Sequence, residues 1–306
     1  MRPLRTLFAL LLCSAAWSLL AVRAAQMNIR VDTTLVVVPV SVTDAQNRFV
    51  LGLEKSDFQL LEDGSAQNVK QFADENAPIS VGLLVDISGS MGSKVDLSRE
   101  AVKQFLKTLD AQDEAALIQF GDTAAVAADF TRDATLIEDK LAHVEPQGLT
   151  ALLDAVSLGL DEMKKAKNTR KALIIISDGG DNHSRYTTDQ IKELVRKADV
   201  QVYSMGVYER FPAFALSAAE LTGPRLLKQL SEQTGGRAFS ASDADELPAI
   251  AERIGIELRN QYVLAYSPSN RKKDGTYRHL EVKVKEPPGL PPLKARWRAG
   301  YYAPVE

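Results

Sequence analysis

Between about residues 79 and 258, short apolar segments alternate with longer amphipathic ones. The segments 81–87 and 172–177 are almost wholly apolar, as strands buried on both faces require. Further strands are expected near 115–120, 124–130, 200–207 and 238–240, and helices near 94–109, 135–144, 152–165, 189–198, 225–234 and 247–259. This alternation predicts an α/β fold, with a doubly wound, mainly parallel sheet covered by helices on both faces.

On both sides of this region the apolar residues recur with a period of two. One face of a strand near 36–43 carries only valines, and Pro39 predicts that this strand lies at a sheet edge. The segment 58–62 is expected to pair with 69–72. Further strands are expected after residue 261, at 262–266, 279–285 and 295–301.

Neither flank could bury much core by itself, because each has only about fifty residues. We therefore predict that the two flanks form one smaller antiparallel β-sandwich, with the α/β domain inserted between its halves. The predicted domains are 28–77 and 259–306 for the sandwich and 79–258 for the inserted domain.

Residues 1–24 have the pattern of a signal peptide. Arg2 and Arg5 precede an apolar segment, and Val22-Arg23-Ala24 resembles a cleavage site. We expect the mature chain to be periplasmic or secreted and not inserted in a membrane; an uncleaved N-terminal anchor is the alternative.

Charge and cysteine content exclude several functions. Without residues 1–24 the chain would have 34 basic and 40 acidic side chains, a balance of −6, which argues against nucleic acid and anionic membrane as partners. Cys13 is the only cysteine. The mature chain would therefore have no disulfide, no thiolate metal ligand and no cysteine nucleophile.

Oxygen-bearing side chains follow the two most apolar strands. Asp86, Ser88 and Ser90 form a D-x-S-x-S pattern after the first, and Asp178 follows the second. Thr150 lies in a glycine-containing loop at the start of a helix. Ligands bind at the carboxyl ends of strands in such sheets, and an all-oxygen set suits a hard divalent cation. The alternative is that Asp86 and the serines only form a turn and cap the next helix.

Taken together, these three segments resemble the von Willebrand factor type A (VWA) domain. The resemblance implies a metal-ion-dependent adhesion site (MIDAS), usually for Mg²⁺, with Mn²⁺ or Ca²⁺ as alternatives. It implies that Ser88 and Ser90 bind the ion directly, that Thr150 and Asp178 exchange between direct and water-mediated contact, and that Asp86 acts mostly through water. An Asp or Glu carboxylate of a protein partner would complete the coordination.

The flanks resemble the exported "VWFA-related" proteins of acidobacteria. The resemblance rests on Asp57-Phe58 leading to Glu62-Asp63-Gly64, on the segment 261–266 and on the closing Arg298-Ala299-Gly300-Tyr301. It supports the architecture and export more than a particular role.

We expect a recognition or adhesion module and not an enzyme. One alternative is that the metal site is purely structural and the sandwich binds the partner; another is service to a metal-inserting ATPase complex. A haloacid-dehalogenase-type phosphatase would need a second aspartate where Ser88 stands.

Residues near the five predicted metal ligands could form a rim that contacts the partner. Asp181 and His183 are candidates, with a plain surface loop as the alternative. Phe211 and Phe214 are candidates too, unless they cover the edge of the sheet. The basic residues between 164 and 171 are expected to be a solvated helix end, with a patch for an acidic partner as the alternative.

Overall fold

The inserted region forms a six-stranded sheet in the order β10-β9-β8-β5-β6-β7. The structure is a computed structural model that describes residues 35–73, 77–208, 218–241, 244–286 and 292–305, so the predicted signal peptide lies outside it. The strands are β5 (Ile79–Asp86), β6 (Glu114–Phe120), β7 (Ala124–Thr131), β8 (Arg170–Ser177), β9 (Gln201–Val207) and β10 (Ala238–Ala241). All neighbours are parallel except β6 and β7, which are antiparallel.

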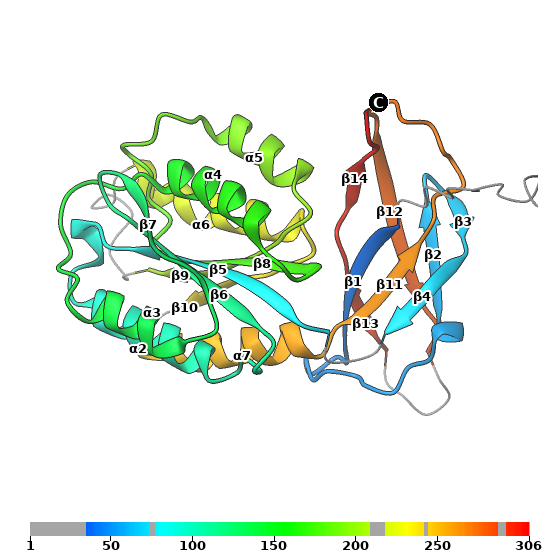
Figure 1. Cartoon of the computed structure of the whole chain (residues 1–306), viewed down its shortest axis with the longest axis horizontal. Helices are drawn as coiled ribbons and strands as arrows, with labels where there is room; N and C mark the ends of the chain where they lie inside the picture. The colour runs from blue at the N-terminus through cyan, green and yellow to red at the C-terminus, as the bar shows by residue number, and fades with distance from the viewer. Residues whose placement is uncertain (1–34, 74–76, 209–217, 242–243, 287–291, 306) are drawn as a thin grey trace, which may run out of the picture. The chain divides into compact units, whose positions relative to one another are not determined.

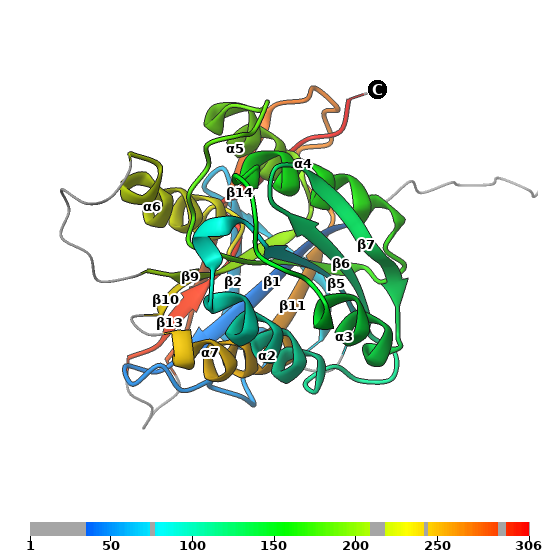
Figure 2. The same cartoon turned by 90° about the vertical axis from the view of Figure 1, so that its left-hand side faces the viewer.

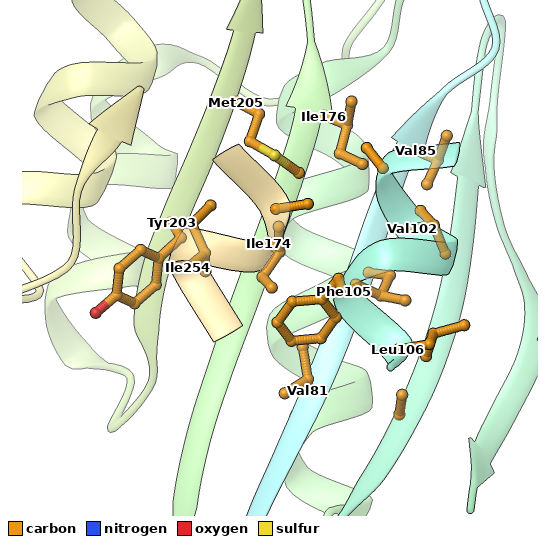
Figure 3. Packing of buried hydrophobic residues seen from close by; sticks show 14 of the residues in the cluster. Val81, Val85, Val102, Phe105, Leu106, Ile174, Ile176, Tyr203, Met205 and Ile254 are labelled. Atoms are coloured by element: carbon orange, nitrogen blue, oxygen red, sulfur yellow. The ribbon is translucent and has the colours of Figure 1, made fainter. Parts of the chain in front are cut away.

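Helices cover both faces of this sheet (Figure 1 and, after a quarter turn, Figure 2). One face carries α2 (Lys94–Leu106), α3 (Ala134–Ala142) and α7 (Leu247–Arg259), and the other carries α4 (Leu152–Glu162), α5 (Thr188–Lys197) and α6 (Ala218–Glu232). Successive residues of a strand enter opposite cores: Ile174 packs with Phe105 of α2 (Figure 3), whereas Ile175 packs on the α4 side. The predicted doubly wound α/β sheet is confirmed.

The flanking segments form two four-stranded sheets, in the orders β13-β1-β11-β4 and β14-β12-β2-β3. The strands are β1 (Val36–Thr43), β2 (Phe58–Glu62), β3 (Ser65–Gln67), β4 (Val69–Ala73), β11 (Tyr262–Tyr266), β12 (Tyr277–Val284), β13 (Lys294–Arg296) and β14 (Gly300–Tyr302). Each sheet takes strands from before and after the insertion, and their side chains share one core. The two flanks therefore form one antiparallel sandwich around the inserted domain, as predicted.

Two predictions about these strands are wrong, one about a pairing and one about an edge position. The segment 58–62 pairs with β3 and β12, whereas β4 pairs with β11 in the other sheet. β1 is not an edge strand, because it lies between β13 and β11. However, β13 pairs only with Ser41–Thr43, so Pro39 lies in the part of β1 that β13 does not reach, where a missing N–H is tolerated.

Two predicted elements have different bounds. The last strand, predicted at 295–301, is two strands in different sheets, β13 and β14. Trp297 lies where the chain crosses between them, and its indole N–H donates to the carbonyl of Leu280 at 2.9 Å. Helix α6 begins at Ala218 rather than near Arg225. It contains Pro224, a residue that usually lies at the start of a helix or kinks it.

Arg170 was predicted to belong to a solvated helix end. It is instead buried, with 5% exposure. Its guanidinium donates to the carbonyl of Ala77 at 2.9 Å and to Gln261 Oε1 at 3.1 Å, and also to the carbonyl of Leu258. Three acceptors compensate the buried charge. Arg170 thereby links the start of β5 to the end of α7, the two points at which the inserted domain joins the sandwich.

None of the helices in the described part of the chain has the length and hydropathy needed to span a membrane.

Candidate metal centre

The candidate site lies where the order of strands in the six-stranded sheet reverses. From β5 the chain proceeds to β6 and β7 on one side, and then returns to β8 on the other side of β5. The loops after β5 and β8 leave the carboxyl ends of the strands at this point, which is where ligands bind in such folds. Asp86 is the last residue of β5, and Asp178 directly follows β8.

The Asp86 carboxylate is fully enclosed, with 0% exposure. Its Oδ1 accepts a hydrogen bond from the Ser88 N–H at 2.9 Å, and its Oδ2 accepts one from the Ser177 hydroxyl at 2.6 Å. None of the ion pairs in the described part of the chain includes Asp86. Burial, with a smaller contribution from the nearby charge of Asp178, raises the pKa of Asp86 to about 6.

The side chains of the two serines in the D-x-S-x-S pattern lie close to each other. Their hydroxyl oxygens lie 3.1 Å apart; Ser88 is buried and Ser90 is exposed. Ser88 directly precedes the short helix η3 (Gly89–Met91), Ser90 lies within it, and the fully buried Met91 holds this helix against the domain. The pair of hydroxyls therefore connects the buried carboxylate of Asp86 with the surface.

Backbone hydrogen bonds join the serine turn to the loop of Thr150. The N–H of Gly89 donates to the carbonyl of Gly148 at 3.0 Å. Thr150 is buried; its N–H donates to Asn182 Oδ1 at 2.8 Å, and its carbonyl accepts from the N–H groups of Asn182 and His183. The loop that follows β8 is thereby tied to the Thr150 loop.

Asp178 is 6% exposed, and its Oδ1 accepts from the Gly180 N–H at 3.1 Å. The next residue, Gly179, has φ +79°, and a Cβ there would lie 2.8 Å from the backbone of Gly223 in α6. Only glycine allows this close approach of two backbones. All five predicted ligands thus lie on three joined loops at the same edge of the sheet.

The predicted rim residues differ in their surroundings. Asp181 Oδ1 accepts from the N–H of Leu153 at 3.2 Å and from the Ser184 hydroxyl at 2.5 Å, so this carboxylate caps the start of α4. His183 is exposed beside Thr150. Contact of these two residues with a ligand stays a prediction, and Phe211 and Phe214 lie outside the described residues.

Three residues that hold the loops in place were not predicted from the sequence. The Ser177 hydroxyl bridges Asp86 and the N–H of Gly179, the latter at 2.9 Å. Asn182 accepts from Thr150, and Asp122 Oδ1 accepts from the N–H of Leu149 at 2.6 Å. The one available signal was the polar Ser177 at the end of an apolar strand; the other two contacts join segments far apart in the chain.

The donor set fits a hard divalent cation. The residues at the edge offer hydroxyl and carboxylate oxygens, and neither Asp86 nor Asp178 takes part in the ion pairs of the described residues. Among those residues, no group of three or more His, Cys, Asp or Glu side chains is arranged to hold a metal. An oxygen-only set suits a hard divalent cation better than a metal that prefers nitrogen and sulfur ligands.

The fold and the site together define a Rossmann-like domain with an aspartate–hydroxyl cluster at its switch point. The family model of the von Willebrand factor type A domain matches residues 81–180, a range that includes all five predicted ligands. The chain therefore contains a VWA domain. Domains of this class are protein-interaction and adhesion modules and are generally not enzymes.

Similar proteins support the fold. A von Willebrand factor type A structure from Catenulispora acidiphila aligns with a TM-score of 0.52 at 13% identity, over 90% of this chain and 75% of that one. Proximal thread matrix protein 1 from the mussel byssus aligns with a TM-score of 0.50 at 19% identity, over 65% of this chain and 51% of that one.

Two uncharacterized bacterial proteins are similar in sequence. One, from Borreliella burgdorferi, is 25% identical over 201 residues, which is 59% of each chain. The other, from Synechocystis sp., is 25% identical over 114 residues, 36% of this chain and 27% of that protein. The alignments thus span well under two thirds of the relatives' own lengths.

We expect Asp86 to make the cation-free protein less stable as the pH rises. Its folded-state pKa of about 6 lies above the ordinary value of 3.8, so its contribution is fully present below pH 4 and is lost as the pH rises through 6. The loss is on the order of 3 kcal/mol, because the group is buried. Urea unfolding in EDTA at pH 4 to 7 measures it, with Asp86→Asn as the control. The same pH dependence in both proteins would contradict this assignment.

Proposed function

We propose that the VWA domain recognises a protein partner through a divalent cation, Mg²⁺ in the first instance, with an Asp or Glu carboxylate of the partner completing its coordination. The observation that supports this most directly is the enclosed Asp86 carboxylate, which is paired with no cation and lies behind two hydroxyls that lead to the surface. A buried, unpaired charge is costly unless something compensates it.

Within this proposal, Ser88, Ser90 and Thr150 would hold the cation through their hydroxyls, and Asp178 would do so directly or through water. Asp86 would provide negative charge from behind while orienting the N–H of Ser88 and the hydroxyl of Ser177. The bound cation would supply an electrophilic point for a carboxylate. Because neutral hydroxyls and at most one carboxylate, that of Asp178, would contact the cation directly, it would stay electrophilic enough to accept a carboxylate of the partner.

The pattern of residues 1–24 supports export, so the partner would be found in the periplasm or outside the cell. Both a binding role and a purely structural role for the cation are compatible with an exported protein. The two differ in what removal of the cation does to partner binding.

Affinity capture from envelope extract separates these roles. The natural full chain and the variants Asp86→Ala and Asp189→Ala are immobilised, and each is tested in Mg²⁺ and in EDTA. Asp189→Ala is the control, because its carboxylate is 97% exposed on α5. We expect capture in Mg²⁺ by the natural chain and by Asp189→Ala, loss in Asp86→Ala, and elution by EDTA. A partner retained equally under all conditions would rule out cation-dependent recognition and would favour binding by the sandwich.

A further inference from the structure

A second concave site lies on the edge of the molecule formed by α6, β10 and β13. It has a volume of about 790 Å³. Its charged side chains are four cations and a single carboxylate: Arg225, Lys228, Arg237, Arg296 and Glu232. The whole chain has a net charge of −3, so this local excess of positive charge runs against the overall balance. The cluster of positive charge therefore does not follow from the overall composition of the chain.

Arg296 is the least compensated of these cations. Its side chain is half-buried and lines the cavity, while its Nη1 is enclosed by protein and meets no acceptor among the described residues. Burial lowers the pKa of Arg296, and the positive charge of Arg237 lowers it further. Because this atom is enclosed, any contact with a ligand in the cavity would be made by the other atoms of the Arg296 guanidinium.

The neighbouring carboxylate of Glu257 offsets this charge only in part, because it also pairs with Arg237. Glu257 is fully buried; it pairs with Arg237 at 3.4 Å and accepts from the Tyr203 hydroxyl at 3.4 Å. Arg237 and Arg253 both lie over the ring of Phe239, at 4.6 and 5.8 Å from its centre. The guanidinium groups of Arg237, Arg253 and Arg296 thus share one buried carboxylate, and Glu232, which lines the cavity, lies 3.8 Å from Lys228.

The walls of the cavity are suited to more than a bare ion. Tyr208 and Trp297 provide aromatic surface, and the volume falls in the range of small-molecule sites. A Cβ on Gly235 would lie 2.5 Å from the carbonyl carbon of Trp297, so the backbones of Gly235 and Trp297 are in close contact. This contact holds the wall of β13 against the end of α6.

We propose that this cavity binds the carboxylate or phosphate group of a small organic anion, with Arg296 and Arg237 receiving the charge and Trp297 contacting the organic part. Guanidinium groups pair with both oxyanions in a bidentate manner, so the shared chemistry is an oxyanion. Arg225 and Lys228, exposed on α6, would attract it to the cavity. This site is separate from the candidate metal centre and does not depend on its function.

Fluorescence of Trp297 provides a direct test. The chain has two tryptophans, so Trp17→Phe leaves Trp297 as the only reporter. Inorganic phosphate, phenyl phosphate and benzoate are titrated into the full chain after a chelating resin has removed divalent cations. A cation at the metal centre then cannot hold the anion, and no soluble chelator competes for the cavity. Chloride at matched ionic strength corrects for screening. We expect saturable changes for at least one organic anion, and the stronger of phenyl phosphate and benzoate identifies the group.

Arginine variants decide whether the response comes from this cavity. Arg296→Gln should weaken binding at least about tenfold, as loss of a charge-assisted hydrogen bond does. Arg225→Gln, an exposed position, should weaken it several-fold and remains informative if Arg296→Gln fails to fold. Arg132→Gln, exposed beyond β7 at the opposite edge of the sheet, should have no effect. No saturable response to any anion, or an equal response in all variants, would overturn the proposal.

Discussion

Replacing Asp86 by alanine is expected to lower the affinity for Mg²⁺ on the order of a hundredfold, the upper range for residues that support metal ligands. The substitution removes a buried negative charge and leaves the Ser88 N–H and the Ser177 hydroxyl without their acceptor. The serine turn loses its orientation at the same time as the site loses its charge. Isothermal titration of the full chain with Mg²⁺ measures the effect.

Asp189→Ala is the matched control, because this aspartate is 97% exposed and is none of the five predicted ligands. Its Mg²⁺ affinity should equal that of the natural chain. Thermal unfolding supplies a second readout: Mg²⁺ should raise the Tm of the natural chain and of Asp189→Ala, but not that of Asp86→Ala. Equal Mg²⁺ affinity in the natural chain and Asp86→Ala would show that the cation binds elsewhere.

Glu62→Ala is expected to destabilise the sandwich by about 3–5 kcal/mol, the usual cost of removing one partner of a buried ion pair. Glu62 is 2% exposed and pairs with Arg278 at 3.3 Å, which is 1% exposed. It also accepts from the hydroxyls of Tyr266 and Tyr301, the latter at 2.8 Å. The substitution therefore leaves two hydroxyls without their acceptor and removes the buried carboxylate of Arg278, which keeps the carbonyls of Asn270 and Lys272.

This carboxylate also tests the joint sandwich, because Glu62 precedes the inserted domain and its three partners follow it. Urea unfolding measures the loss of stability, and hydrogen exchange should increase both in β2 and in β12. Glu281→Ala is the control: this residue of β12 is 52% exposed, and its removal should cost about 0.5 kcal/mol or less. Faster exchange in β2 alone would mean that the two flanks are not one cooperative unit.

The sequence alone was sufficient to predict the inserted domain and the segments that carry the candidate site. Strands such as 172–177 are apolar because both of their faces are covered, and the helices between them repeat with a period near 3.6. Asp86, Ser88 and Ser90 form a local pattern, and the parallel order of β5 and β8 brings Asp178 to the same edge. These features depend on short stretches of chain and on one regular topology.

Other features depend on contacts between distant segments, and local patterns do not encode them. β4 has a period of two whether it pairs with β2 or with β11, so the partner was decided by how both sheets close over the shared core. Arg170 lies in a basic stretch, yet carbonyls from before β5 and from the end of α7 enclose it.

The same division applies to the sites. The sequence by itself determined the oxygen donors at the switch point, because their spacing and the strands before them are local. Only the tertiary structure decided that Ser177 supports Asp86, that Asn182 holds Thr150, and that Arg296 shares a cavity with Arg237. Burial and charge compensation arise from packing between segments far apart in the chain.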